Sequence, residues 1–229
     1  DVNARQTLDT QLNVFADFSP TLSEDQRRTP FLFLANIDPE LQLDVLDQME
    51  EVPRLVGLDT MNFWIQRKNS GLRNVLKRVD ALFIDEGEAR DLASEVNLVR
   101  CARHISSLGP KAVVIKRGEH GVLLFHGDSM FASPALPLES VVDPTGAGDA
   151  FAGGFMGYLA ATGDLGPEGL RRATVLGSVM GSFAVESFSL DRISSLSGAE
   201  IDTRFRALVD LTRYTPLQAG ESLPLRDGR

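Results

Sequence analysis

The stretch VVDPTGAGDAFAGGF, residues 141–155, decides how this chain is interpreted. Two glycines flank an alanine, and a single carboxylate, Asp149, follows them directly where small and apolar residues predict a helix. Glycines let the backbone turn tightly and bring bare N–H groups close to a ligand. The first turn of a helix also leaves N–H donors unpaired. The stretch therefore predicts an anion site suited to phosphate, formed by the backbone of Gly146, Ala147 and Gly148.

Asp149 needs a separate explanation, because a carboxylate that served only for binding would repel a phosphate. As a general base it would take the proton from a hydroxyl that attacks a γ-phosphorus. The helix N-terminus favours its ionised form, and the neighbouring amides would stabilise charge that develops on the transferred group. The structural alternative is that Asp149 only complements the helix dipole and that the glycines serve close packing. The stretch lacks the Gly-Lys-Ser/Thr ending of a Walker loop.

The composition limits the class of protein. The chain has 229 residues, of which 43% are hydrophobic and 24% charged, and its net charge is −9. This is enough apolar material for a folded core, and the acidic balance argues against nucleic acid or an anionic membrane as a partner. No apolar run reaches the ~18–20 residues that span a bilayer, and no signal peptide is seen, so a cytoplasmic location is expected. The single cysteine, Cys101, is expected in the core.

Strands and helices are expected to alternate through the first half of the chain, which predicts βαβ units and a mostly parallel sheet flanked by helices. Apolar runs predict strands over residues 31–37, 52–59, 81–85 and 111–116, followed by a hairpin of strands 122–125 and 129–132. Helical spacing and caps predict helices after Asp38-Pro39 and over residues 63–79, 88–95, 98–108, 147–161, 167–187 and 199–213. Residues 214–229 are expected to form a loose tail.

The string DPTGAGDAFAGGF closely resembles the C-terminal signature of the ribokinase-like, or PfkB, carbohydrate kinase family, and the order of elements over residues 31–213 is similar too. The resemblance implies a three-layer ribokinase-like α/β fold and an ATP-dependent transfer of the γ-phosphate to an alcohol group of a sugar or nucleoside. It implies that Asp149 is the catalytic base and that the Gly146-Ala147-Gly148 backbone is the anion hole. ATP and Mg²⁺ are the implied cofactors. Asp143 and Thr145 lie in the loop where many members also bind a monovalent cation such as K⁺.

Two further segments at predicted strand ends resemble the family's nucleotide site. The family often has Asn-x-x-Glu, which organises magnesium and phosphate through water, where this chain has Asp85-Glu86-Gly87-Glu88. Glu88 and Asp85 are therefore candidate metal residues, and an acidic turn that caps the next helix is the alternative. The turn KRGEHG, residues 116–121, resembles a glycine-containing turn beside the nucleotide. Lys116, Gly118 and Gly121, with Thr145, are the expected cofactor-binding residues, and Arg117 could also offset phosphate charge.

Asp59 and Asn62 are candidate substrate contacts, together with Asp149, because the family has an Asp-x-Asn segment near the active cleft at this place. The spacing is one residue longer here, and capping of the following helix is the alternative for Asn62. Trp64 is expected in the core. The resemblance also implies that part of residues 173–185 forms a wall around adenine.

The upstream part of the family pattern is not found in this sequence. The resemblance implies that the N-terminal strands and the lid are largely missing, and residues 1–10 are expected to be the last lid strand. The chain is therefore interpreted as the C-terminal two-thirds of a kinase, with residues 1–213 as the kinase domain. A sugar or nucleoside acceptor, still unidentified, and a homodimer through the lid of the full-length protein are the implied partners. Two alternatives stay open: a non-catalytic nucleotide-binding or regulatory relative, motivated by Asp85 and the missing upstream half, and then a dehydrogenase.

Overall fold

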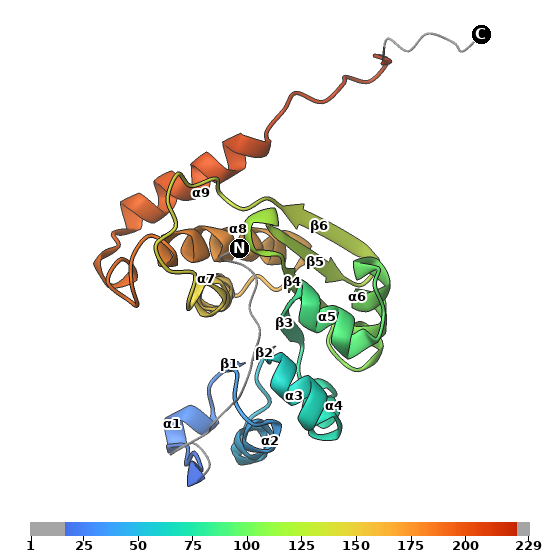
Figure 1. Cartoon of the computed structure of the whole chain (residues 1–229), viewed down its shortest axis with the longest axis vertical. Coiled ribbons are helices and arrows are strands. Elements are labelled where there is room, and N and C mark those ends of the chain that lie inside the picture. Colours follow the sequence, from blue (N-terminus) through green and yellow to red (C-terminus); the bar gives the residue numbers. More distant parts are fainter. Residues whose placement is uncertain (1–16, 224–229) are drawn as a thin grey trace, which may run out of the picture.

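A six-stranded sheet forms the centre of the computed structural model, which describes residues 17–223 (Figure 1). The strands lie side by side in sequence order; β1 to β4 run parallel, and β5 and β6 continue the sheet antiparallel. The strands are β1 (Phe31–Leu34), β2 (Leu55–Asp59), β3 (Ala81–Asp85), β4 (Ala112–Lys116), β5 (Val122–His126) and β6 (Ser129–Ser133). Parallel strands joined through helices predict that the ends of β1 to β4 meet at one edge of the sheet.

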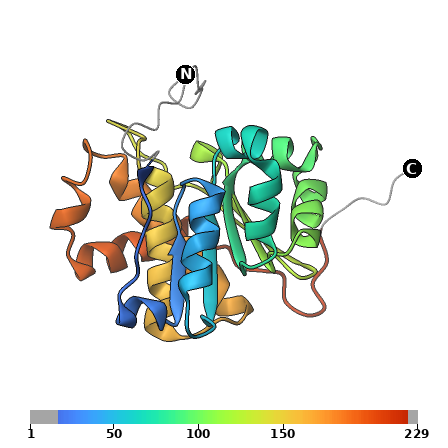
Figure 2. The same ribbon diagram turned by 90° about the horizontal axis from the view of Figure 1, so that it is seen from below.

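Helices cover both faces of the sheet, so the fold has three layers (Figures 1 and 2). The crossover helices α2 to α6 lie on one face, α7 and α8 lie on the other, and α9 packs on the outer side of α8. The helices are α1 (Glu24–Arg27), α2 (Pro39–Gln48), α3 (Asn62–Arg67), α4 (Asn69–Leu76), α5 (Glu86–Ala93), α6 (Leu98–Ser107), α7 (Ala147–Thr162), α8 (Pro167–Ala184) and α9 (Gly198–Thr212), with short 3₁₀ turns η2 (Gly118–His120) and η3 (Ile193–Ser195).

Alternation along the strands fills the two cores. Val56 and Leu58 of β2 belong to the core under α2 to α6, whereas Phe83 of β3 packs edge-on against Phe155 of α7 with ring centroids 5.0 Å apart. Gly57 of β2 faces α7, and a Cβ there would lie 2.9 Å from Sδ of Met156. The absence of a side chain at Gly57 therefore lets the middle of α7 approach the sheet closely.

Most expected elements are present, and the differences have local causes. The helix expected over residues 63–79 is two helices, because Lys68 leaves the helical region at φ −129° and ψ 39°. Lys68 Nζ forms an ion pair with Asp38, the N-cap of α2, at 2.7 Å, so the break between the two helices lies beside the start of α2. Asn69, Ser70 and Gly71, which follow the break, are weak helix formers. The short helix α1 was not expected. Ser23 and Gln26 form a capping box at its N-terminus. The strand expected at residues 1–10 lies outside the described residues.

Several expectations outside the site are also settled. Cys101 is fully buried, and Trp64 is 3% exposed, so both belong to the core. The chain from residue 213 to 223 has no regular element beyond a turn and extends away from the domain (Figure 1). Residues 224–229 of the expected tail lie outside the described residues. Within residues 17–223, none of the helices combines the length and the apolar character that a membrane span requires.

Candidate active site

Polar side chains from three neighbouring strands meet at the carboxyl edge of the sheet. Asp59 ends β2, Asp85 ends β3 and Lys116 ends β4, with Asp85 and Lys116 paired in register. The start of α7 meets the same edge from the other face, because a Cβ on Gly148 would lie only 3.0 Å from Nζ of Lys116. The structure therefore brings together four segments that are far apart in the sequence. The sequence predicted each of them as part of the site.

The first turn of α7 is open. Gly146 enters the helix at a φ of 79°, in the left-handed region that favours glycine, and α7 has no side-chain N-cap. The N–H groups of Gly146, Gly148 and Asp149 have no acceptor among residues 17–223. A Cβ on Gly146 would meet nothing within 4 Å, so the backbone there is accessible. This terminus can thus donate hydrogen bonds to an anion.

One amide of the anion hole expected from the sequence, that of Ala147, already has a partner within the chain. The N–H of Ala147 donates to the carbonyl of Pro144 at 3.3 Å, because the chain tightens into a three-residue turn as the helix begins. The open donors are therefore Gly146, Gly148 and the amide of Asp149 itself. The Asp149 side chain is exposed, and its charge acts on Asp59, so its carboxylate also belongs to this edge of the sheet.

Lys116 and Asp59 form a largely buried ion pair beneath the open turn. Their Nζ and Oδ2 atoms are 3.1 Å apart, and the side chains are 20% and 8% exposed. Burial raises the pKa of Asp59, Lys116 opposes this rise, and the charge of Asp149 adds to it. The Thr60 N–H donates to the other Asp59 oxygen at 2.7 Å. The pair therefore places a fixed ammonium against Gly148 while keeping Asp59 compensated.

Buried polar atoms around Asp59 brace the ends of β1 and β2. Gln42 of α2, 2% exposed, donates its amide to the carbonyls of Ala35 and Asp59 at 2.9 and 3.2 Å. Its Oε1 and the hydroxyl of Thr60 are buried without a hydrogen-bond partner among the described residues. Sequence reasoning missed Gln42, because an amide on a helix carries no signal until the fold places it under two strand ends.

The start of α5 contrasts with that of α7. Asp85 Oδ1 accepts from the N–H of Glu88 at 2.8 Å, and Glu88 Oε2 accepts from the N–H of Asp85 at 3.0 Å. Burial, with the nearby Asp85 charge second, raises the pKa of Glu88 to about 7. Within the described residues no group of three or more acidic, His or Cys side chains is placed to hold a metal ion. Asp85 and Glu88 thus cap α5, as the structural alternative predicted. One oxygen of each carboxylate takes no part in the capping box.

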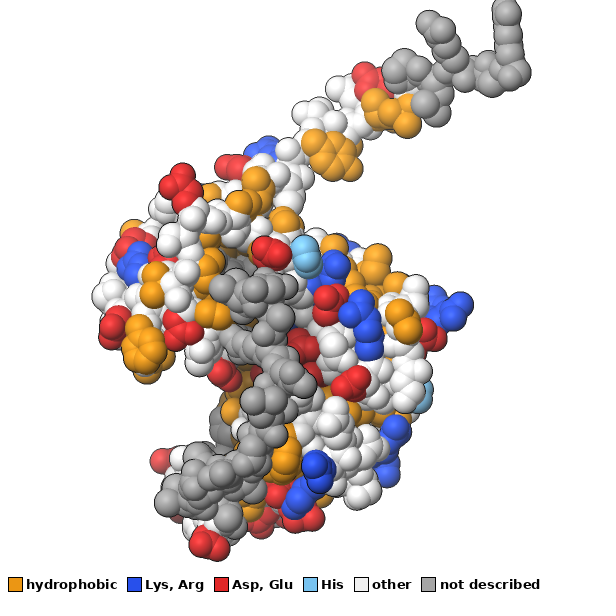
Figure 3. Space-filling view, in the orientation of Figure 1, with side chains coloured by type: hydrophobic (Ala, Val, Ile, Leu, Met, Phe, Trp, Pro, Cys, Tyr) orange, Lys and Arg blue, Asp and Glu red, His pale blue; other side chains and the backbone are white. Residues whose placement is uncertain are grey.

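The turn after β4 divides its expected residues between two roles. The Arg117 guanidinium pairs with Glu86 of α5 at 3.3 Å and so is committed to a protein carboxylate. Both charge signs are interspersed around α5 on the face seen in Figure 3. Gly121 is required by packing, since a Cβ would lie 2.1 Å from the carbonyl of Ser133. Gly118, at φ 54°, begins η2 and remains a candidate for close approach to a ligand.

Two other expected contacts have local explanations. Asn62 is the first residue of α3, whose N-cap is Met61, so the capping expected of Asn62 is wrong: the helix begins one residue earlier than expected. Its amide remains half-buried, three residues beyond Asp59. The Thr145 N–H donates to Asp143 Oδ1 at 2.9 Å, which shapes the loop before α7. Trp64, expected only as core, also donates Nε1–H to Asn36 at 2.9 Å.

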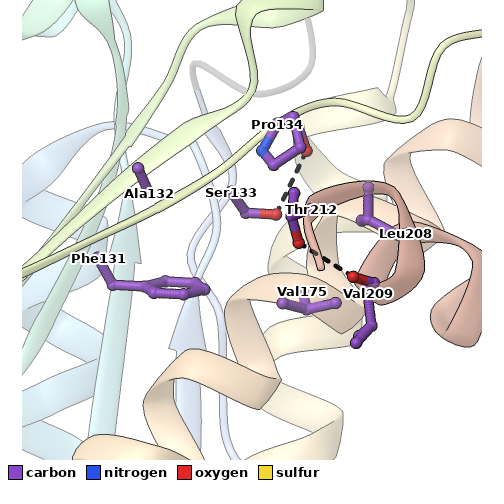
Figure 4. Close-up of a pocket in the computed structure, with 8 residues that line it drawn as sticks. All are labelled: Phe131, Ala132, Ser133, Pro134, Val175, Leu208, Val209 and Thr212. Carbon is purple, nitrogen blue, oxygen red and sulfur yellow. Dashed lines mark hydrogen bonds between the residues drawn. The ribbon is translucent and has the colours of Figure 1, made fainter. Parts of the chain in front are cut away.

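A pocket of about 210 Å³ lies further along the same sheet edge (Figure 4). It is enclosed by β6, α8 and α9, and its lining residues are Phe131, Ala132, Ser133, Pro134, Val175, Leu208, Val209 and Thr212. Ser133 pairs with Val122, which pairs with Lys116. Two strand spacings, about 10 Å, therefore separate the backbones at Lys116 and Ser133. Of the wall expected within residues 173–185, Val175 lines this pocket. No sequence motif indicated that α9 would also line this pocket.

The sequence of this chain is similar to those of known kinases. Residues 5–195 match the family described as pfkB family carbohydrate kinase. The chain is 40% identical over 130 residues to cytidine kinase of Thermococcus kodakarensis, covering 55% of this chain and 46% of that protein. It is 31% identical over 152 residues to inositol 3-kinase of Arabidopsis thaliana, covering 66% of this chain and 35% of that protein. The chain thus spans about half or less of the length of these curated relatives.

Solved structures show the same fold. Fructokinase of Vibrio cholerae O395, in a form with bound fructose, ADP and calcium ion, has a TM-score of 0.67 at 19% identity, over 86% of this chain and 64% of that one. The nucleoside kinase of Methanocaldococcus jannaschii, described as an archaeal member of the ribokinase family, has a TM-score of 0.66 at 19% identity, over 85% of this chain and 60% of that one. The three-layer ribokinase-like arrangement expected from the sequence is therefore confirmed.

Proposed function

Because the chain belongs to the pfkB family of carbohydrate kinases, we propose that it binds ATP at the carboxyl edge of its sheet and transfers the γ-phosphoryl group to a hydroxyl of a small sugar or nucleoside. One observation carries the proposal. The first turn of α7 is uncapped, with open N–H groups on Gly148 and Asp149, an exposed carboxylate on Asp149 and the Lys116 ammonium against its backbone.

Asp149 is the general base in this proposal. It takes the proton of the attacking hydroxyl as that oxygen bonds to the γ-phosphorus, and the bond to the bridging oxygen breaks to release ADP. The exposed carboxylate can reach an acceptor from solvent, and a carboxylate in the first turn interacts favourably with the helix dipole. Base and anion donors thus come from one turn of helix, which limits how far they can drift apart.

The open amides and Lys116 supply the complementary charge. The N–H groups of Gly146, Gly148 and Asp149 donate to phosphoryl oxygens without reorganisation, because no protein acceptor among the described residues has to be displaced. Lys116 compensates Asp59, so an incoming phosphate meets a neutral pair rather than a bare carboxylate. Lys116 is therefore assigned to the nucleotide site, and Asp59 acts through it.

The acidic residues beside the site fit an indirect metal role. Asp85 and Glu88 each have one carboxylate oxygen outside their capping box, and Mg²⁺ prefers few protein ligands and several waters. They are the residues of this chain that would hold such an ion through water, and the ion would offset phosphate charge. A monovalent cation near Asp143 and Thr145, a dimer and a cytoplasmic location are proposed from the family likeness.

The pocket between β6, α8 and α9 is proposed for the nucleotide base. Its lining is mostly apolar, and its distance of about 10 Å from Lys116, measured in strand spacings, suits a base and a terminal phosphate on one molecule. The Phe131 ring and the Val175 side chain offer apolar contact. The hydroxyls of Ser133 and Thr212 also line the pocket and donate to the carbonyls of Pro134 and Val209 (Figure 4).

A coupled assay of ATP consumption tests the proposal against a panel of nucleosides, inositols and sugars, the acceptor classes named by the relatives. We expect turnover with at least one acceptor and none above background for Asp149→Asn. ATP binding measured by calorimetry without phosphorylation of any acceptor would favour the non-catalytic nucleotide-binding alternative. Absence of ATP binding would refute both.

A further inference from the structure

Two arginines converge on one buried aromatic ring at the far end of α8. Phe183 is 1% exposed, and the guanidinium carbons of Arg204 and Arg192 lie 3.5 and 5.0 Å from its ring centroid. Arg204 comes from α9, and Arg192 comes from the segment between α8 and α9. Cations stacked on an aromatic face are held in orientation as well as in place, so this ring couples α8 to both following segments.

A single carboxylate binds both guanidinium groups. Glu186 accepts from Arg204 Nη2 at 2.6 Å and from Arg192 Nε at 3.3 Å. Arg204 also donates to the Ser182 hydroxyl at 3.3 Å, and Arg192 reaches Glu200 in the first turn of α9 at 2.7 Å. The side chains of Arg204, Arg192 and Glu186 are only 19%, 27% and 26% exposed. We call Arg192, Arg204 and Glu186, together with Phe183, the arginine clamp.

The arginine clamp contacts the C-terminal end of α8, and this end is hydrogen-bonded to the loop before α7. The Val185 carbonyl, next to Glu186, accepts from the N–H groups of Val142 and Asp143 at 2.8 and 3.4 Å. One turn earlier, a Cβ on Gly181 would lie 3.2 Å from the carbonyl of Ala147. The end of α8 therefore contacts both sides of the turn that opens the α7 amides, although none of the clamp residues touches that turn's open donors.

We propose that Arg204 is a positioning residue for the open first turn of α7, acting through Glu186 and the Val185 carbonyl. Two cations at the C-terminal end of α8 also complement its dipole. When Arg204 is lost, Glu186 keeps one partner, Phe183 loses its closest cover, and the Val185 carbonyl is no longer held in one position. The effect on the turn itself is independent of the kinase activity, whereas the effect on nucleotide affinity rests on the proposed function.

Arg206 provides a matched control on the same helix. It lies two residues from Arg204, about 200° around α9, and pairs with Asp202 at 2.8 Å with a side chain that is 74% exposed. Arg204→Met and Arg206→Met remove the same charge from the same element. Arg204→Lys keeps the charge but loses the planar fork that serves Glu186, Ser182 and the ring together.

The test combines hydrogen–deuterium exchange over residues 141–150 with calorimetric titration of MgATP. We expect Arg204→Met to speed exchange in this segment about tenfold and to weaken MgATP binding about tenfold, with Arg204→Lys intermediate and Arg206→Met unchanged. Exchange in the crossover helices should stay as in the wild type, which separates positioning from general destabilisation.

Unchanged exchange over residues 141–150 in Arg204→Met would overturn the proposal. Faster exchange throughout the protein would overturn it too, since it would assign the arginine clamp to stability alone. If Arg204→Met does not fold, Glu186→Gln, which keeps the shape and removes the shared charge, decides between the same two outcomes. If exchange changes as expected but no variant, including the wild type, binds MgATP, the positioning holds and the proposed function fails.

Discussion

Two helices begin at the same edge of the sheet and end up with opposite chemistry. At the start of α5, Asp85 and Glu88 satisfy each other's backbone N–H groups in a closed capping box. At the start of α7, Gly146 leaves the terminus without any side-chain cap. A capped terminus stabilises its own helix, whereas an uncapped one keeps its donors for another molecule. An expected anion site is therefore best recognised by a helix start whose backbone N–H groups have no acceptor within the protein.

The largest expected effect comes from removing the carboxylate of the open terminus. Asp149→Asn should lower kcat about 10³-fold, the contribution of a general base, and leave MgATP affinity within about twofold. The measurement is steady-state turnover with calorimetric binding, and Asp202→Asn on α9 is the control for a lost surface charge. Turnover near the wild-type rate in Asp149→Asn would mean that this terminus is open without being catalytic.

The next effect tests the ion pair beneath the open terminus. Lys116→Met leaves Asp59 buried without its cation, so we expect a loss of about 2–3 kcal/mol in the free energy of unfolding. Lys111→Met breaks the surface pair with Asp80, where the lysine side chain is 77% exposed, and should cost at most about 1 kcal/mol.

A pH series sharpens this prediction. Without Lys116 the pKa of Asp59 rises further above its unfolded value, so the folded state binds the proton more tightly and stability must fall as pH increases. Adding Asp59→Asn should recover part of the loss in urea titrations. Equal costs for Lys116→Met and Lys111→Met would show that the buried pair is worth no more than a surface one.

Filling the open terminus gives a smaller effect. A Cβ in Gly148→Ala would press on Lys116 Nζ, 3.0 Å away, and would occupy the space beside the donors, so MgATP Kd should rise about tenfold. In Gly153→Ala of the same helix the Cβ meets nothing within 4 Å, and the gain in helix propensity should add up to about 1 kcal/mol of stability with unchanged Kd. If both variants bind MgATP like the wild type, the first turn of α7 does not contact the nucleotide as proposed.

The smallest effect concerns the closed terminus. Burial raises the pKa of Glu88 to about 7 from an ordinary value of 4.5. A group whose pKa is raised by folding stabilises the protein below pH 4.5, and that contribution is lost as pH rises toward 7. Because Glu88 is only half-buried, we expect the loss to be about 1 kcal/mol. Thermal unfolding from pH 4.5 to 7.5 should show a shallower decline for Glu88→Gln, whereas the exposed control Glu119→Gln should follow the wild type.

Much of the fold could be predicted because its signals are local. Apolar runs located every strand of the sheet, and Asp38-Pro39 marked the start of α2. The helix expected over residues 63–79 failed because its break at Lys68 depends on Asp38, a residue thirty positions away. The partner of the Ala147 amide could not be predicted for a related reason: the DPTGAGD string places three amides at the helix start but does not say which of them donates to the Pro144 carbonyl.

Local signals in the sequence specify the order of elements, the glycine turn at residue 146 and the carboxylate that follows it, because periodicity, backbone freedom and helix ends are properties of neighbouring residues. By contrast, the pairing of Lys116 with Asp59, 57 positions away, and the stacking of Arg204 on Phe183 became visible in the folded domain alone. Such partners depend on strand order, register and the approach of helices to the sheet. Those relations arise from packing the whole domain, and no short stretch of the chain contains them.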